Sequence, residues 1–228
     1  MRELIDPLKP ILLLADSQLL FWRENGELLI ERIVEATTRD QLKAAYVGAS
    51  NGDQPDFYAI FVAAMEGVGV FDCRMIPSAL SEADLAFLND ADIILLAGGD
   101  VEIGWRVFRT NGLSEHIVRR YFEGASLIGV SAGAVQLGVC GLAADGSLIE
   151  TFKVVPFIVG AHEEAKNWKT ARELLRLSAT GKKAIGLPTG GGAIYHQHQI
   201  EPLRHPLVEL SLNRGNLHQT FIQAPARK

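Results

Sequence analysis

The sequence has few cysteines, no long apolar run and no excess of positive charge, and each of these absences excludes a class of protein. Cys73 and Cys140 are the only cysteines in 228 residues, and both stand among apolar residues. Buried free thiols are therefore expected rather than a disulfide framework. No apolar stretch approaches the roughly 20 residues that a membrane-spanning helix needs. A net charge of −5 gives no electrostatic reason to expect a nucleic acid or an anionic membrane as a partner.

The sequence also lacks targeting and linker features. The opening MRELIDPLKPILLLAD has a short apolar run between acidic residues, unlike a secretory signal, so a cytoplasmic location is expected. No internal repeat, low-complexity tract or linker rich in proline and serine is present. With 48% hydrophobic and 21% charged residues, the composition is typical of a globular protein. We expect a single domain over residues 1–228, large enough to bury a substantial core.

Short apolar runs alternate with longer amphipathic segments over the first two-thirds of the chain. The runs expected as strands are 11–15, 44–48, 68–75, 91–96 and 126–130. The segments expected as helices are 19–36, 57–66, 81–88 and 114–122. This alternation predicts parallel βαβ units in an α/β fold, and the continuous apolar runs indicate strands covered on both faces. After residue 180, short segments rich in glycine, histidine and proline predict edge strands and hairpins.

Residues 127–134 (LIGVSAGA) are the most informative stretch, because a G-x-S-x-G pattern around Ser131 directly follows an expected strand. In a parallel sheet, ligands bind at the carboxyl ends of the strands. Such a turn strains the serine backbone and exposes its hydroxyl, and the glycines leave room for the tight approach. The helix that follows presents amides that favour a negatively charged oxyanion. The alternative is a turn of small residues selected for packing alone, but its position after a strand favours a nucleophile.

A glycine pair ends the preceding expected strand and should lie at the same edge of the sheet. The amide of Gly99 is placed to form an oxyanion hole with the amide of Ala132. The other interpretation is a turn into a helix, with Asp100 as its N-cap. The two interpretations are compatible, since a rigid cap helps to hold the amide in place.

A nucleophilic serine needs a base, and the histidines provide the candidates. His162 follows the apolar run 154–159, where a general base can reach an elbow serine. His116 lies on an expected amphipathic helix and is interpreted as a surface residue. His196, His198 and His205 have the composition of a metal site, but an exposed hairpin is the favoured interpretation, and no metal is expected.

Four segments together resemble a known family. They are 95–100 (LLAGGD), 129–134 (GVSAGA), 155–162 (VPFIVGAH) and 184–188 (AIGLP). In this order and spacing they resemble the serine peptidases that contain peptidase E (aspartyl dipeptidase) and cyanophycinase, over roughly residues 10 to 200. The resemblance implies a three-layer sandwich with a mostly parallel central sheet, similar to class I glutamine amidotransferases.

The resemblance also implies an activity and roles for the residues. Ser131 would be the nucleophile, His162 its base, and the amides of Gly99 and Ala132 the oxyanion hole. The implied reaction is acyl transfer, in which water hydrolyses an acyl-enzyme formed from a small or unusual peptide. No cofactor is implied. A homodimer is an open alternative for the oligomeric state.

The sequence departs from the family pattern at the expected third member of the triad. In peptidase E a glutamate that orients the histidine stands where this chain has Thr189. Glu163, Glu164 and Glu201 are the alternative acids, although acidic residues after a strand also serve as helix starts. Arg172 loosely matches basic residues that bind acidic side chains in relatives, so no substrate specificity is carried over.

Three hypotheses therefore stand side by side. The first is a serine peptidase or amidase. The second is a peptide-binding homologue with attenuated or no turnover, which the threonine at position 189 motivates. The third, a glutaminase-like subunit, is disfavoured because that chemistry uses a reactive cysteine and neither cysteine lies at the elbow.

Overall fold

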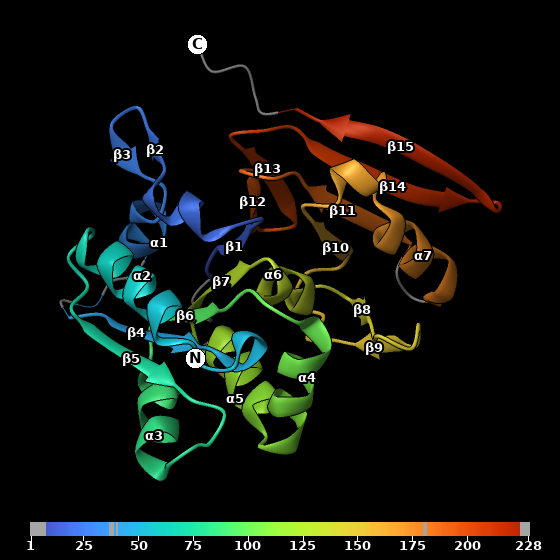
Figure 1. The fold of residues 1–228 in the computed structure, drawn as a ribbon. Helices are drawn as coiled ribbons and strands as arrows, with labels where there is room; N and C mark the ends of the chain where they lie inside the picture. The colour runs from blue at the N-terminus through green and yellow to red at the C-terminus, as the bar shows by residue number, and fades with distance from the viewer. Residues whose placement is uncertain (1–7, 37–38, 40, 180–181, 224–228) are drawn as a thin grey trace, which may run out of the picture.

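The computed structural model describes residues 8–36, 39, 41–179 and 182–223. Residues 1–7, on which the expectation about a secretory signal partly depends, lie outside the described residues. The central sheet has seven strands in the order β13-β12-β1-β7-β6-β4-β5. Their bounds are β1 Ile11–Leu14, β4 Lys43–Val47, β5 Asp72–Ile76, β6 Ile93–Leu96, β7 Ser126–Val130, β12 Gly192–His196 and β13 Gln199–Leu203. The pairings from β1 through β5 are parallel, whereas β12 and β13 add an antiparallel hairpin at one edge, so the predicted mostly parallel sheet is confirmed (Figure 1).

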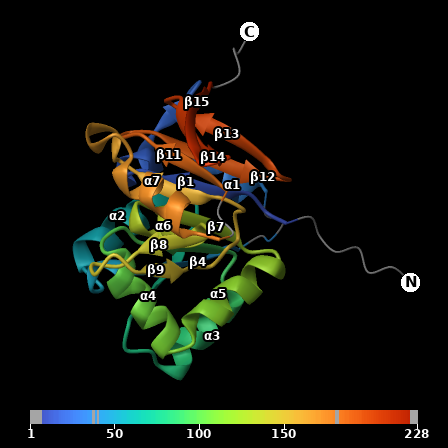
Figure 2. The ribbon, with the colours of Figure 1, turned by 90° about the vertical axis from the view of Figure 1, so that its right-hand side faces the viewer.

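A second sheet of four strands lies beside the first, in the order β10-β11-β14-β15. Its strands are β10 (Ile158–Ala161), β11 (Lys183–Leu187), β14 (Leu207–Asn213) and β15 (Asn216–Ile222). Helix α7 (Lys169–Leu177) packs on this sheet, against β10, β11 and β14 (Figure 2). Two hairpins, β12–β13 and β14–β15, follow residue 180 as expected, but β14 and β15 join β10 and β11 in the second sheet rather than extending the central one.

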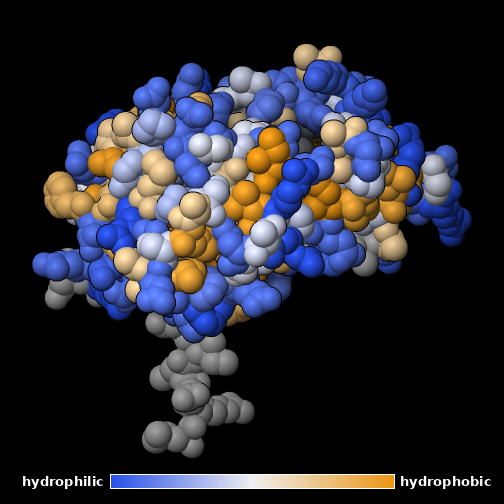
Figure 3. Space-filling view, turned by 60° about the horizontal axis from the view of Figure 1, so that its bottom comes forward, coloured by the Kyte–Doolittle hydropathy of each residue, from blue (hydrophilic) through white to orange (hydrophobic). Residues whose placement is uncertain are grey.

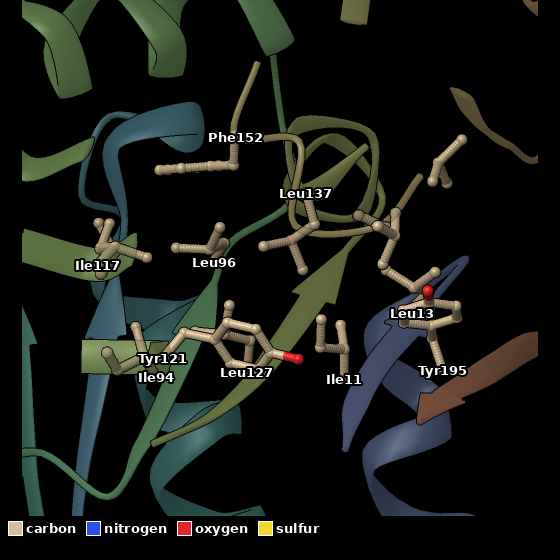
Figure 4. Packing of buried hydrophobic residues seen from close by; sticks show 14 of the residues in the cluster. Ile11, Leu13, Ile94, Leu96, Ile117, Tyr121, Leu127, Leu137, Phe152 and Tyr195 are labelled. Carbon is tan, nitrogen blue, oxygen red and sulfur yellow. The ribbon is translucent and has the colours of Figure 1, made fainter. Parts of the chain in front are cut away.

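The layers follow from the alternation of side chains along each buried strand. Ile11 and Leu13 face one core cluster, whereas Leu12 and Leu14 face the other. The first cluster is covered by α3 (Glu82–Asp90), α4 (Val101–Thr110), α5 (Leu113–Phe122) and α6 (Ala132–Leu137). Figure 4 shows this cluster, with strand residues such as Leu96 and Leu127 facing Ile117 and Leu137. The second cluster is covered by a 3₁₀ turn η1 (Ser17–Phe21), α1 (Glu31–Glu35) and α2 (Pro55–Glu66).

The helix predicted over residues 19–36 is wrong. The segment instead contains η1, a small hairpin of β2 (Arg23–Glu24) and β3 (Glu27–Leu28), and the short helix α1. Asn25 and Gly26 form the turn of that hairpin, with φ values of 54° and 92°. The asparagine–glycine pair is a strong turn signal, and it interrupts the helical periodicity around it.

Several other expectations need smaller corrections. The strand expected over 68–75 begins only at Asp72, because residues 66–70 close the preceding helix with turn hydrogen bonds. The helix start expected at Ser81 is confirmed, with a capping box to Asp84. Helix α4 has no counterpart among the predicted helices, although the sequence indicates Asp100 as a potential N-cap. The remaining elements are η2 (Ala49–Asn51), the hairpin of β8 (Cys140–Leu142) and β9 (Leu148–Glu150), and η3 (Glu164–Lys166).

Within the described residues, no helix is both long and apolar enough to cross a membrane. One face of the molecule is mostly hydrophilic, with a band of apolar residues near its middle (Figure 3). Both cysteines are free thiols, with Cys140 buried and Cys73 half-buried. An apolar band of the kind seen in Figure 3 is normal, because much of the surface of any folded protein is apolar.

Candidate active site

Ser131 occupies a strained turn between β7 and α6. Its φ of 49° and ψ of −109° lie outside the usual regions for a residue with a side chain. The turn is held by the Ser131 amide, which donates to the carbonyl oxygen of Leu14 on the adjacent strand at 2.8 Å. A Cβ at position 133 would lie 2.1 Å from the carbonyl oxygen of Leu96, and one at position 129 would lie 2.7 Å from Cα of Ala134. Both glycines of the G-x-S-x-G pattern are therefore required by close packing, as the sequence predicts.

His162 faces Ser131 from the second sheet. Its Nε2 lies 2.7 Å from Oγ of Ser131, within hydrogen-bond distance. The residue follows β10 directly, and its φ of 44° turns the chain away from the strand direction. Its amide donates to the carbonyl oxygen of Leu187 at 2.9 Å, which ties the turn to β11. Sequence spacing and structure thus bring the same serine and histidine together.

The glycine pair after β6 also lies at the elbow. A Cβ at position 98 would lie 3.3 Å from Cβ of Ser131. Gly99 has a φ of 135°, and a Cβ there would meet the carbonyl oxygen of Ser50 at 2.0 Å. Asp100 is the N-cap of α4, because its Oδ1 accepts from the amide of Ile103 at 2.8 Å. The cap interpretation of Asp100 therefore holds, and the cap fixes the loop that carries the Gly99 amide.

The amides of Gly99 and Ala132 are the two donors expected for an oxyanion hole. Ala132 is the first residue of α6, so its amide has no acceptor within that helix. Gly99 lies in the loop between β6 and α4, and among the described residues no backbone carbonyl accepts a hydrogen bond from its amide. Both residues line a cavity that also contains Ser131 and His162. The arrangement is suited to receiving a developing negative charge.

The three alternative acids have different surroundings. Glu163 lies against the first turn of α7, with Oε2 at 3.4 Å from the amide of Ala171. Glu201, on β13, forms an ion pair with Arg32 at 2.8 Å. Glu164 instead lies near enough to the histidine for its carboxylate to interact with a protonated imidazole, and its Oε1 accepts from the amide of Thr189 at 3.1 Å.

Glu164 is held in its ionised form. Burial opposes ionisation, but hydrogen bonds from the Thr189 side chain and from backbone amides outweigh it, and a positive charge on the His162 ring adds to them. Together they lower the pKa of Glu164 below its usual value. Among the described residues, none forms a hydrogen bond with Nδ1 of His162. The carboxylate near the imidazole thus comes from position 164, whereas the family resemblance places it at position 189.

The remaining candidates lie away from Ser131. Arg172 lines neither cavity at the elbow; its guanidinium bonds to Asn167 and to Oε1 of Gln219 at 2.6 Å. His116 is half-buried on α5, with Nδ1 at 2.8 Å from Oδ1 of Asn89. His196 ends β12, and His198 lies in the hairpin turn that follows it. Across the described ranges, no group of three or more histidine, cysteine, aspartate or glutamate residues could hold a metal ion.

Two cavities meet at Ser131 and His162. The first, here called the apolar pocket, has a volume of about 290 Å³ and extends toward η1 and α2. The second has a volume of about 240 Å³ and extends toward β8 and α7. The sequence interpretation missed the walls of the apolar pocket, including Tyr46, Phe57 and Asp16. The only signal was that Asp16 and Tyr46 stand near the carboxyl ends of expected strands.

Comparison with known proteins identifies the same architecture. The chain is similar to a peptidase from an acI-B1 Actinobacterium, with a TM-score of 0.73 and 16% identity over 97% of this chain and 96% of that one. It is also similar to a Listeria monocytogenes EGD-e protein assigned as a peptidase E, with a TM-score of 0.63 and 16% identity over 86% of this chain and 98% of that one. At this identity the two structures show the fold. No curated protein sequence matches the chain.

The family itself is shown by the sequence. The model of peptidase family S51 matches residues 11–201, which include the elbow, the glycine pair, His162 and the segment up to Thr189. The resemblance inferred from the four sequence segments is therefore confirmed, and the chain belongs to peptidase family S51.

Proposed function

We propose that this protein is a serine peptidase or amidase that hydrolyses small peptides through an acyl-enzyme on Ser131. Membership of peptidase family S51 supports a peptidase role. The observation that carries the finer proposal is the contact of 2.7 Å between Oγ of Ser131 and Nε2 of His162. This distance is the one that a general base needs to take the serine proton.

In the proposed reaction, Oγ of Ser131 attacks the carbonyl carbon of the scissile amide while His162 takes the hydroxyl proton. The oxygen of the tetrahedral intermediate accepts hydrogen bonds from the amides of Gly99 and Ala132. His162 then gives its proton to the leaving amine, and the acyl-enzyme remains. A water molecule, deprotonated by His162, attacks the ester and releases the acid and free Ser131.

Glu164 supplies the charge of the missing acid in this proposal, without a hydrogen bond to the ring. Its carboxylate is ionised and adds negative charge near the ring when His162 becomes an imidazolium. Thr189 positions that carboxylate through its amide and side chain. A glutamate at 164 with a threonine at 189 thus replaces the single glutamate that the family resemblance places at 189.

The proposal is tested by incubating the purified protein with a mixture of dipeptides and tripeptides and following product formation by mass spectrometry. We expect hydrolysis by the wild type and a loss of about 10³-fold or more in Ser131→Ala and His162→Ala, as for members of other serine triads. Thermal unfolding of each variant serves as the control for folding. Hydrolysis that survives Ser131→Ala would contradict the proposal.

A second candidate function is peptide binding without turnover. The observation that favours it is that Nδ1 of His162 has no hydrogen-bond partner among the described residues, so the ring is held less firmly than in a complete triad. Calorimetry that detects peptide binding, with intact peptide recovered afterwards, would support this candidate. Turnover abolished by His162→Ala would exclude it.

A further inference from the structure

The apolar pocket opens directly onto the groups proposed to carry the reaction. Ser131, His162 and Gly99 form part of its wall. Whatever fills the pocket therefore lies next to the scissile bond. Its volume of about 290 Å³ lies near the lower limit of small-molecule pockets, which begin at about 300 Å³, so it suits one residue rather than a long segment.

The wall of the pocket is apolar and partly aromatic. Leu20 comes from η1, Tyr46 from β4, and Phe57 and Phe61 from α2. The rings of Tyr46 and Phe61 contact each other with centroids 5.5 Å apart, which gives the pocket a rigid side. The hydroxyl of Tyr46 accepts a hydrogen bond of 2.8 Å from Nδ2 of Asn51. Its polar end is thus paired within the protein, and the ring is the part left for a ligand.

Phe57 is the most informative of these residues because 48% of it is exposed. It stands in the first turn of α2, at the border of the pocket. Covering a large apolar side chain that lies partly in water removes apolar surface from the solvent, which favours binding of the ligand. An apolar ligand side chain would provide that cover.

Charge in the pocket disfavours an acidic ligand. No lysine or arginine is among its lining residues, all of which belong to the described part of the chain. The acidic side chain is Asp16, whose oxygens accept from the amides of Gln18 at 3.0 Å and Gly190 at 2.8 Å. A carboxylate entering this pocket would lose water, meet no lysine or arginine and be repelled by Asp16.

We propose that the apolar pocket binds an uncharged apolar side chain beside the scissile bond, so that the preferred substrates are short peptides with a leucine-like or phenylalanine-like residue there. This proposal rests on the proposed function for the reaction itself. It assigns the specificity to Leu20, Tyr46, Phe57 and Phe61, and the exclusion of acidic residues to the absence of lysine and arginine and to Asp16.

The test uses two dipeptide series, Xaa-Ala and Ala-Xaa, in which Xaa is leucine, phenylalanine, aspartate or lysine. We expect kcat/KM for leucine or phenylalanine to exceed that for aspartate by at least about tenfold in one series. Phe57→Arg, which places a cation at the border, should reduce or invert this ratio. Phe71→Arg is the matched control, because Phe71 is 76% exposed and lies outside the pocket. An aspartate preference in the wild type, or a ratio that Phe57→Arg leaves unchanged, would overturn the proposal.

A binding measurement separates this proposal from the proposed function. Ser131→Ala, which cannot form an acyl-enzyme, is titrated by calorimetry with Leu-Ala, Ala-Leu, Asp-Ala and Ala-Asp. Tighter binding of a leucine peptide, weakened by Phe57→Arg, supports the pocket assignment even if the wild type hydrolyses nothing. Tighter binding of an aspartate peptide, or no binding of any of the four, overturns it even if the wild type is an active hydrolase.

Discussion

Oγ of Ser131 and Nε2 of His162 are 2.7 Å apart although the two residues belong to different sheets. Ser131 follows β7 of the central sheet, and His162 follows β10 of the four-stranded sheet. The first core cluster runs from one sheet to the other, since it contains Leu127 of β7 together with Val159 of β10. Packing in that cluster therefore sets the distance between the nucleophile and its base.

Replacement of Glu164 should reduce turnover much more than replacement of its neighbour. For Glu164→Gln we expect kcat to fall by about 10- to 100-fold, because the imidazolium loses a nearby negative charge. This is less than the loss of about 10⁴ when a buried triad acid is replaced, since Glu164 is exposed and solvent screens its charge. Glu163→Gln is the matched control, with kcat expected to stay within about threefold. Steady-state kinetics on one peptide measures both.

A substitution at Thr189 should rescue the loss caused by replacing Glu164. Thr189→Glu, introduced into the Glu164→Gln variant, restores a carboxylate at the position where the family resemblance places one. We expect kcat to recover by about tenfold relative to the single variant. Equal activity of Glu164→Gln and Glu163→Gln, with no recovery in the double variant, would contradict the role given to Glu164.

The cysteines should be unreactive and dispensable. Burial, followed by the charges of Asp72 and Glu66, raises the pKa of the Cys73 thiol to about 11. Burial likewise raises the pKa of Cys140. The thiolate is the reactive form, so at pH 8 only about one Cys73 side chain in 10³ is ionised, and alkylation should accelerate about tenfold per pH unit toward pH 11. Intact-mass measurement of iodoacetamide labelling follows this rise.

Activity provides the second half of that measurement. We expect hydrolysis to be unchanged after exposure to iodoacetamide at pH 8, whereas the chain unfolded in urea should take up two labels. Rapid labelling of the folded protein at pH 8, together with loss of activity, would point to a cysteine nucleophile instead.

The elbow glycine should not tolerate a methyl group. In Gly133→Ala the new Cβ would lie 2.1 Å from the carbonyl oxygen of Leu96, a backbone atom that cannot move without shifting β6. We expect a loss of at least about 2 kcal/mol in the free energy of unfolding. Gly67→Ala at the end of α2 is the control, since its Cβ would lie 3.3 Å from the carbonyl oxygen of Ala64 and should cost less than about 1 kcal/mol. Urea denaturation measures both, and equal stability of the two variants would contradict the account of the elbow.

The buried strands could be predicted because their residues leave no alternative. The strand expected over 126–130 coincides with β7, whose five residues are all buried. The helix expected over 19–36 failed because apolar residues at helical spacing also fit a hairpin once Asn25 and Gly26 accept positive φ values. Local periodicity does not reveal whether the tertiary packing selects the helix or the hairpin.

The sequence likewise predicts some residues of the site and misses others. Ser131 and His162 are identified by local pattern and family resemblance, because each stands in a turn at the end of a strand. The choice among three acids could not be made from the sequence, since it depends on the fold of η3 beside Thr189. The apolar pocket was also out of reach, because Leu20, Tyr46 and Phe57 belong to three separate elements that only the tertiary structure brings together.

The central claim is that Ser131 is an activated nucleophile, and labelling with a fluorophosphonate probe tests it most directly. We expect the wild type to take up one probe, located on Ser131 by peptide mass spectrometry, with labelling lost in Ser131→Ala and slowed by at least about 10²-fold in His162→Ala. A folded wild type that takes up no probe, or that labels equally well in Ser131→Ala, would contradict the claim.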